Sequence, residues 1–355
     1  MAMSDRYAIV LAAGHGKRMK SALPKVMHTV AGRPLVYYSV TAALSAGARR
    51  AVVVVGHGRE QVVPYLAESF AERISIAVQH EIKGTGSATA QAIPALPKQA
   101  DRVLILCGDT PLLRPEDLHT LVDALVSHPS APLAMLTCVV DEPTGYGRII
   151  RDNAGCIREV REHRDLESDA QRAIREVNPG VYCACTAFLR ESLSKLNTNN
   201  AQGELYLTDI VSMAASSGGT VGVAADASSL VGVNDRAQLA AAETVMQARI
   251  IERLRRSGVT VRDGAVIHDT VCVSPDVTIG NGAALLGNTT VAAGAIVGIG
   301  CVVDSTHIGE GATLLPYTVV TDSDIEANAV IGPFAYICGG RDCSTLRTDL
   351  GQQGR

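Results

Sequence analysis

The strongest constraint on how this 355-residue chain folds is a six-residue repeat that begins near residue 264. An aliphatic residue occupies every sixth position seven times in succession, and the spacing resumes after each of two one-residue deletions. Because a half-buried surface strand alternates every two residues, the longer period predicts a left-handed parallel β-helix of a little over four coils. The thirteen inward-facing positions are Ile267, Val273, Ile279, Leu285, Val291, Val297, Val303, Ile308, Leu314, Val320, Ile325, Ile331 and Ile337.

The first half of the chain follows a different pattern, in which strand-like and helix-like segments alternate. The predicted strands cover residues 7–13, 51–56, 74–79 and 103–107, and the predicted helices between them cover residues 34–46 and 59–70. Strands separated by helices predict β-α-β units and a mostly parallel, Rossmann-like α/β sheet. Ligands of such sheets bind at the carboxyl ends of the strands.

The two patterns are joined by a stretch with apolar residues at helical spacing, residues 235–257, which is followed by Gly258 in a position typical of a helix end. The chain is therefore expected to contain an α/β domain over 1–230 and a linking helical arm over 231–258. The β-helix follows over 259–338, and a polar tail over 339–355.

The amino-acid composition argues against several classes of function. The net charge of −4 does not favour a nucleic-acid or acidic-membrane partner. The nine cysteines are scattered without a Cys-x-x-Cys pair, which argues against a zinc site or a disulfide framework. The sequence has neither a signal-peptide core nor an apolar run of about 18 residues. We therefore expect a soluble cytoplasmic protein.

The segment from residue 9 to residue 25 has the features of a phosphate-binding loop. A buried strand runs into a loop with small residues, whose backbone N–H groups can face phosphate oxygens. Arg18 and Lys25 add positive charge for a polyphosphate. The spacing matches neither G-x-G-x-x-G nor a P-loop. The residues whose backbone lines the cradle are Leu11, Ala12, Ala13 and Gly14.

The run Leu-Ala-Ala-Gly-x-Gly-x-Arg-Met with Leu-Pro-Lys resembles the signature of sugar-nucleotide pyrophosphorylases. Further motifs resemble, in order and spacing, one bifunctional family, the N-acetylglucosamine-1-phosphate uridyltransferases/glucosamine-1-phosphate acetyltransferases. The resemblance extends to about residue 338 and makes residues 1–230 a nucleotidyltransferase domain. The matching stretches are residues 11–25, 84–86, 108–111, 145–148, 162–165, 200–204 and 232–234.

Uridylyl transfer needs charge neutralisation on the α-phosphate rather than a protein nucleophile, because the attacking sugar phosphate is already ionised. Asp109, at the end of an aliphatic strand, is the natural carboxylate for Mg²⁺. The resemblance implies Asn234 as the second ligand. It also implies that Lys25 contacts the α- or β-phosphate and that Arg18 contacts the leaving pyrophosphate.

The resemblance also implies the groups that read the two substrates. Leu11–Gly14 and Gln79 would read uracil, with Gly84, Thr85 and Gly108 beside the nucleotide. Gly147, Glu162 and Asn178 would bind N-acetylglucosamine. This chain departs from the family where Cys107 replaces a tyrosine and Pro179 replaces a small hydroxyl residue.

Structural explanations remain open for several of these residues. Asp109 could be a turn cap, Asn234 a helix cap, Gln79 a strand end and Glu162 a solvated charge. The activity could also be nucleotidyl transfer between UTP or dTTP and glucose-1-phosphate. A non-catalytic regulatory subunit is a third possibility, although a decayed site should have lost at least one of its charged residues.

Two expectations concern the β-helix. Proteins that resemble this chain trimerise along it, which implies a homotrimer. The resemblance also implies that the family completes its acetyltransferase site further along the β-helix. By the same resemblance, this sequence stops about a hundred residues short of the family's length. Tyr336, Ile337 and Cys338 stand where the family has an arginine-rich segment. We therefore expect no acetyltransferase activity.

Overall fold

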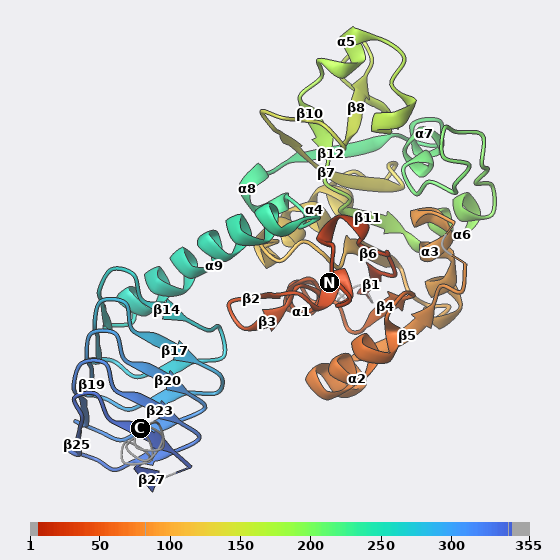
Figure 1. Ribbon diagram of the computed structural model, residues 1–355. Coiled ribbons are helices and arrows are strands. Elements are labelled where there is room, and N and C mark those ends of the chain that lie inside the picture. The colour runs from red at the N-terminus through yellow and green to blue at the C-terminus, as the bar shows by residue number, and fades with distance from the viewer. Residues whose placement is uncertain (1–5, 82, 340, 343–355) are drawn as a thin grey trace, which may run out of the picture. The chain divides into compact units, whose positions relative to one another are not determined.

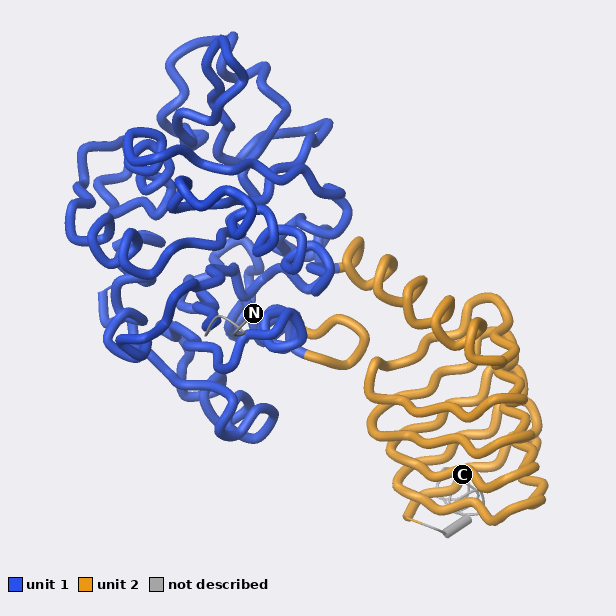
Figure 2. The backbone as a smooth tube through the Cα atoms, turned by 180° about the vertical axis from the view of Figure 1, so that it is seen from behind, with its two compact units in different colours: residues 1–28, 34–239 blue, residues 29–33, 240–355 orange. Residues whose placement is uncertain are grey.

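The computed structural model describes residues 6–81, 83–339 and 341–342 and consists of two compact units (Figure 2). The first unit contains Pro34–Leu239 with the chain before Thr29, and the second contains Thr29–Arg33 with the chain after Leu239. Most of the predicted polar tail, residues 340 and 343–355, lies outside the described residues.

The first unit is built on a ten-stranded mixed sheet (Figure 1). Four parallel strands form one side of it, in the order β5, β4, β1, β6. They span Ile74–Val78, Ala51–Val55, Arg6–Ala12 and Arg102–Cys107. The sheet continues through β11 (Tyr182–Cys185), β7 (Leu133–Val139), β10 (Glu176–Asn178), β8 (Gly147–Arg151) and β9 (Ile157–Arg161), while β12 (Thr220–Ala224) pairs with β7.

Helices cover both faces of this sheet. The helices α1 (Leu35–Ser45), α2 (Arg59–Phe70) and α4 (Pro115–Ser127) pack on the face that contains Ala8 and Val10. The helices α3 (Thr85–Ala92), α6 (Thr186–Leu193) and α7 (Asp209–Ala215) pack on the face that contains Tyr7 and Ile9. Short helices α5 (Asp169–Arg172) and α8 (Ala227–Leu230) lie in connections. The predicted strands and helices of the first half are confirmed to within a residue or two.

The strand order places a ligand-binding crevice at β1 and β6. The chain moves from β1 outward to β4 and β5, and then returns to the other side of β1 as β6. Loops that leave the carboxyl ends of β1 and β6 therefore diverge, and this switch point is where α/β sheets bind ligands. The backbone N–H of Gly108 donates a hydrogen bond to the carbonyl of Leu11 at 2.9 Å, which joins the two strand ends.

The second unit contains the predicted β-helix, whose strands stack in three parallel sheets (Figure 1). The first sheet stacks β13 (Thr260–Val261), β16 (Thr278–Ile279), β19 (Ile296–Val297), β22 (Thr313–Leu314) and β25 (Val330–Ile331). The second stacks β14 (Val266–Ile267), β17 (Ala284–Leu286), β20 (Val302–Asp304), β23 (Val319–Thr321) and β26 (Tyr336–Cys338), with antiparallel β27 (Arg341–Asp342) at its end. The third stacks β15 (Cys272–Val273), β18 (Thr290–Val291), β21 (His307–Ile308) and β24 (Asp324–Ile325).

The predicted inward positions are confirmed for most of the repeat. Leu285, Val297 and Leu314 are fully buried, whereas Val273 is half-buried. The repeat starts one six-residue unit earlier than predicted, because Val261 is also buried and pairs with Ile279 in the next coil. A second inward position, two residues before each aliphatic one, is filled mainly by small residues: Ala265, Ala283, Thr289, Ala295, Cys301, Thr306, Ala312, Thr318 and Ser323.

The chain also contains a long helix and a short hairpin. The helix α9 spans Arg236–Arg256, close to the predicted arm, and Gly258 follows it with φ +91°. The hairpin of β2 (Thr29–Val30) and β3 (Arg33–Pro34) has its turn in the second unit, where Ala31 is bonded to other residues of that unit. The N–H of Ala31 donates to the Glu243 carboxylate at 2.7 Å, and its carbonyl accepts from the Asp269 N–H at 2.8 Å. No helix within the described residues has the length and apolarity to cross a lipid bilayer.

Candidate active site

A cavity of about 260 Å³ opens at the carboxyl ends of β1 and β6. The residues that line this cavity come from four motifs that are separate in the sequence. Its wall contains Leu11, Ala12, Ala13, Gly14, Lys25, Gln79, Gly84, Thr85 and Asp109, together with Val26, Ala88, Cys107 and Glu204. Most of the predicted nucleotide-binding residues therefore surround one space.

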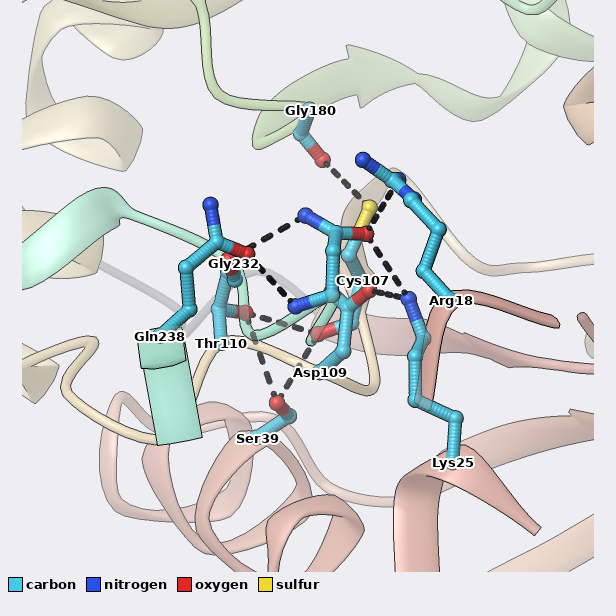
Figure 3. Close-up of polar contacts among 10 residues, drawn as sticks. Arg18, Lys25, Ser39, Cys107, Asp109, Thr110, Gly180, Gly232 and Gln238 are labelled. Atoms are coloured by element: carbon cyan, nitrogen blue, oxygen red, sulfur yellow. Dashed lines mark hydrogen bonds and ion pairs between the residues drawn. The ribbon is translucent and has the colours of Figure 1, made fainter. Parts of the chain in front are cut away.

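Four polar side chains converge at this place (Figure 3). The Lys25 ammonium group contacts the Asp109 carboxylate in an ion pair and also donates a hydrogen bond to the Asn234 amide oxygen at 3.2 Å. The Arg18 guanidinium donates to the same oxygen at 2.8 Å. The Lys25 and Asp109 side chains are only 14% and 17% exposed, so their attraction is poorly screened by water.

The backbone around Asp109 determines where its carboxylate lies. Its carbonyl accepts a hydrogen bond from the Val233 N–H at 2.8 Å, which holds the segment 232–234 against the end of β6. A Cβ at Gly232 would lie only 3.2 Å from an Asp109 carboxylate oxygen, so the glycine allows this close approach. The Gln238 side chain accepts from the Asn234 N–H at 2.8 Å and fixes that residue from α9.

The loop after β6 is also tied to its neighbours. The Cys107 carbonyl accepts hydrogen bonds from the Ser39 and Thr110 hydroxyls at 2.8 and 2.7 Å (Figure 3). Burial, followed by the nearby charge of Asp109, raises the pKa of the Cys107 thiol to about 12. This thiol remains protonated and unreactive at neutral pH.

The oxygen donors of Asp109 and Asn234 suit a magnesium ion. Both side chains already direct an oxygen toward one cation, the Lys25 ammonium group. Proteins usually hold magnesium through one or two side-chain oxygens, and substrate phosphates and waters complete its octahedron. The described residues contain no cluster of three or more His, Cys, Asp or Glu side chains that could form a closed metal cage. The donor set fits an ion that is shared with a phosphate.

The residues predicted to read the nucleotide base are arranged around Gly84. The buried Gln79 side chain donates a hydrogen bond to the Gly84 carbonyl at 3.1 Å. The Thr85 hydroxyl accepts from the Leu207 N–H at 3.1 Å. Gly84 has φ +97°, and a Cβ there would overlap the Leu205 carbonyl oxygen. These contacts position the backbone at the start of α3 beside the cavity.

The residues predicted to bind the sugar form a second group. Gly147 and Asn178 face each other across β8 and β10, and a Cβ on Gly147 would lie 3.5 Å from a Glu162 carboxylate oxygen. These three residues do not contribute to the wall of the 260 Å³ cavity. A weak hydrogen bond of 3.8 Å from the Cys107 thiol to the Gly180 carbonyl links the segment after Asn178 to β6 (Figure 3).

Glu162 is not a solvated surface charge. Burial raises the pKa of its carboxyl, and the Thr208 hydroxyl, which donates to it at 3.1 Å, opposes this effect. Glu162 also contributes to the wall of a polar cavity of about 500 Å³ on the side of β9. The sequence analysis missed Thr208, because nothing in a threonine 46 residues away indicates this contact.

The capping explanations for Asp109 and Asn234 are also wrong. The Asp109 carboxylate contacts Lys25 rather than a backbone N–H, and the Asn234 oxygen contacts Lys25 and Arg18. The cap of α9 is supplied instead by Asp235, whose carboxylate accepts from the Gln238 N–H at 2.8 Å.

Comparison with known proteins identifies the family of this chain. A family model described as a MobA-like NTP transferase domain matches residues 8–181. A relative from Sorangium cellulosum (strain So ce56), named bifunctional protein GlmU, is 52% identical over 93% of this chain and 70% of its own length. Proteins of the same name from Anaeromyxobacter dehalogenans (strain 2CP-C) and Corynebacterium aurimucosum are 44% and 43% identical over 94% of this chain, and each is covered to 69%. With a nucleotidyltransferase sheet followed by a β-helix, this chain belongs to the GlmU family.

Proposed function

We propose that this protein transfers the UMP group of UTP to N-acetylglucosamine-1-phosphate, forming UDP-N-acetylglucosamine and pyrophosphate. The observation that carries the proposal is the convergence of Lys25, Arg18, Asp109 and Asn234 at the switch point of the sheet. A non-catalytic subunit would not need this set of side chains, in which Lys25, Asp109 and Asn234 are half-buried and Arg18 is exposed. The membership in a family of nucleotidyltransferases supports the same conclusion.

The reaction is an exchange at the α-phosphorus of UTP. A phosphate oxygen of the sugar phosphate attacks the α-phosphorus, and the bond from that phosphorus to the oxygen bridging it to the β-phosphate breaks. The nucleophile is an anion from the start, so the protein needs no general base. Its task is to hold two anions in line and to neutralise the charge that they bring together.

Each charged residue has a separate part in this task. Lys25 is half-buried at the end of the loop and would face the reacting phosphate. There its ammonium group can stabilise the negative charge that develops in the transition state. Arg18 is exposed at the rim, where its guanidinium can bind the departing pyrophosphate at two oxygens. The bare backbone of Leu11–Gly14 allows the nucleotide to approach closely.

Magnesium would be held by Asp109 and Asn234. When bound, it would neutralise charge on the α-phosphate and orient this group for attack. The same two oxygens also contact the Lys25 ammonium group, so the proposed metal ligands and the proposed phosphate-binding cation lie together.

A substrate panel tests this proposal. Pyrophosphate release should be measured with UTP, dTTP, ATP and GTP, each with N-acetylglucosamine-1-phosphate and glucose-1-phosphate, in Mg²⁺ and in excess EDTA. We expect turnover with UTP and N-acetylglucosamine-1-phosphate, and its loss in EDTA. Higher kcat/KM for UTP or dTTP with glucose-1-phosphate would favour the related sugar nucleotidyltransferases instead. Absence of turnover with every pair would favour a regulatory subunit.

Two further properties are proposed for the second unit. We propose a homotrimer formed along the β-helix, to be tested by light scattering of the purified chain. We also propose that this chain lacks acetyl transfer, because Tyr336, Ile337 and Cys338 replace an arginine-rich segment. Release of CoA from acetyl-CoA in the presence of glucosamine-1-phosphate would contradict this.

A further inference from the structure

A buried tyrosine in the middle of the sheet, Tyr182, contacts one of the predicted sugar-binding residues. It lies on β11 between Ile105 of β6 and Met135 of β7, and only 1% of its surface is exposed. Its ring belongs to the apolar core on the α3 face of the sheet. Its hydroxyl accepts a hydrogen bond of 2.7 Å from the Asn178 side-chain NH₂ group. A buried phenol needs such a partner, and here the partner is Asn178.

The orientation of the Asn178 amide follows from its two contacts. The backbone N–H of Gly180 donates to the Asn178 amide oxygen at 3.0 Å. Because an N–H can only donate, the amide oxygen must face Gly180 and the NH₂ group must face Tyr182. The amide is thus held at both ends. Among the described residues, these two bonds leave one N–H and one oxygen lone pair of the amide for another group.

The backbone next to Asn178 is also restricted. Pro179 fixes its own φ and favours an extended conformation for the residue before it. Gly180 follows with φ +79°, and a Cβ there would lie 2.9 Å from the Cys107 thiol. The hydroxyl residue that the family has at position 179 is absent here. The Tyr182 hydroxyl is therefore an alternative source of a hydrogen bond to this segment.

The tyrosine keeps one protonation state under working conditions. Burial raises the pKa of the Tyr182 hydroxyl far above its usual range, and the nearby Glu162 carboxylate raises it further. Neither Asn178 nor Tyr182 changes charge near neutral pH. The contact between them is therefore constant while the enzyme works.

We infer that Tyr182 is a positioning residue that holds the Asn178 amide in one orientation and thereby favours a sugar phosphate carrying an acetamido group. The inference rests on the function proposed above and deepens it. An acetamido group offers one N–H and one carbonyl oxygen, which complement the lone pair and the N–H that Asn178 has left. Glucose-1-phosphate presents a single hydroxyl oxygen at that position, in place of the two separate atoms of the acetamido group that complement the fixed amide.

The substitution Tyr182→Phe tests this role while keeping the ring in the core. The Asn178 NH₂ group would lose its acceptor, and the amide would be held only by the Gly180 N–H at its oxygen end. We expect kcat/KM for N-acetylglucosamine-1-phosphate to fall about 3- to 10-fold, mainly through KM, which is the effect of one hydrogen bond. For glucose-1-phosphate it should change less than about twofold. The KM for UTP, measured in the same assays, should stay within about twofold of the wild-type value.

The matched control is Tyr7→Phe, which removes the hydroxyl of another buried tyrosine at the amino end of β1, away from the strand ends that form the site. All kinetic constants of this variant should equal those of the wild type. A double-mutant cycle then tests whether Tyr182 acts through Asn178. In an Asn178→Ala background, Tyr182→Phe should cause no further loss of kcat/KM.

Several results would overturn the inference. They are equal losses for both sugar phosphates, a parallel rise in the KM for UTP, unchanged kinetics, or losses that multiply in the double mutant. A melting temperature shared by Tyr182→Phe and the Tyr7→Phe control would show that folding is not the cause. Failure of the wild type to use UTP with N-acetylglucosamine-1-phosphate would instead refute the proposed function, and the inference with it.

Discussion

Lys25 has the most demanding position of any residue in the site. Its ammonium group lies between the Asp109 carboxylate and the Asn234 amide oxygen, at the end of the loop that starts at β1. This arrangement keeps a cation next to the place where a phosphate would react. The same two oxygens are the ones proposed above to hold magnesium.

Replacement of Lys25 by methionine should therefore remove activity and leave the fold intact. We expect kcat to fall about 100- to 1,000-fold, the usual cost of removing one preorganised group that stabilises transition-state charge. Pyrophosphate release measures the loss. Lys98→Met, at an exposed position before β6, is the control and should retain wild-type turnover. A Lys25→Met enzyme within about threefold of wild type would contradict the role.

The sugar-binding role proposed for Glu162 would make sugar binding depend on pH. Burial raises the pKa of its carboxyl, so the group takes up a proton at a higher pH than an exposed glutamate does. In the proposed role, the ionised form would accept two sugar hydroxyls. We expect kcat/KM for the sugar phosphate to fall as pH decreases through this raised pKa, and Glu162→Gln to be weak at every pH without this limb. An identical acid limb in Glu162→Gln would assign it to another group.

The Glu162 carboxyl should also make the stability of the fold depend on pH. Here the protonated form is the favourable one, whereas sugar binding is expected to need the ionised form. A carboxyl whose pKa is raised in the folded protein stabilises the fold below its unfolded pKa, and this contribution is lost as pH rises through the folded pKa. At pH 8 the fold bears the cost of a buried charge. Glu162→Gln should therefore raise the melting temperature at pH 8 more than at pH 4.5. Equal shifts at both pH values would show that the substitution acts by packing alone.

At the scale of elements, the turn into α3 depends on one glycine. Gly84 has φ +97° and faces the Leu205 carbonyl, whereas Gly155, with φ +81° in the β8–β9 connection, has no other atom within 4 Å of a Cβ. Gly155→Ala should cost about 1 kcal/mol for the backbone conformation. Gly84→Ala should cost about 2–4 kcal/mol, because it adds the overlap, and should raise the KM for UTP. Denaturant unfolding of both variants gives the comparison, and equal losses would refute the overlap.

The secondary-structure elements could largely be predicted from the sequence, whereas several side-chain contacts between them could not. The period of six placed the coil interior, and alternating strands and helices placed the phosphate loop and Asp109 at the carboxyl ends of strands. Such patterns are local or periodic, so they can be recognised in a single chain. The Thr208–Glu162 and Tyr182–Asn178 contacts could not be recognised in the same way. They arise when the sheet brings separate strands and loops together, and no spacing in the chain encodes them.

At the scale of the whole molecule, the chain crosses between its two units at two places. One crossing lies in α9, and the other is the hairpin segment Thr29–Arg33, which belongs to the second unit although it follows the phosphate loop. Gly32 has φ +81° there, and a Cβ on it would overlap the His268 imidazole. This glycine allows the hairpin to pack closely on the first coil of the β-helix.

Gly32→Val should detach the hairpin. We expect a protease of broad specificity to cleave residues 29–33 several times faster than in the wild type, because the segment loses its contacts with Glu243 and Asp269. Mass spectrometry locates the cut. Gly145→Val is the control, since Gly145 has φ +87° and open space around it. Equal protection of residues 29–33 in both variants would show that the hairpin contact does not depend on this close approach.

The most direct test of the account is the turnover of Asp109→Ala with UTP, N-acetylglucosamine-1-phosphate and Mg²⁺. Asp123→Ala, at an exposed position on α4, is the control. The account predicts UDP-N-acetylglucosamine from the wild type and from the control, and at least a hundredfold lower kcat in Asp109→Ala, on the order of what loss of a metal ligand costs. Full turnover of Asp109→Ala would contradict the assignment of the reacting centre to the carboxyl ends of β1 and β6.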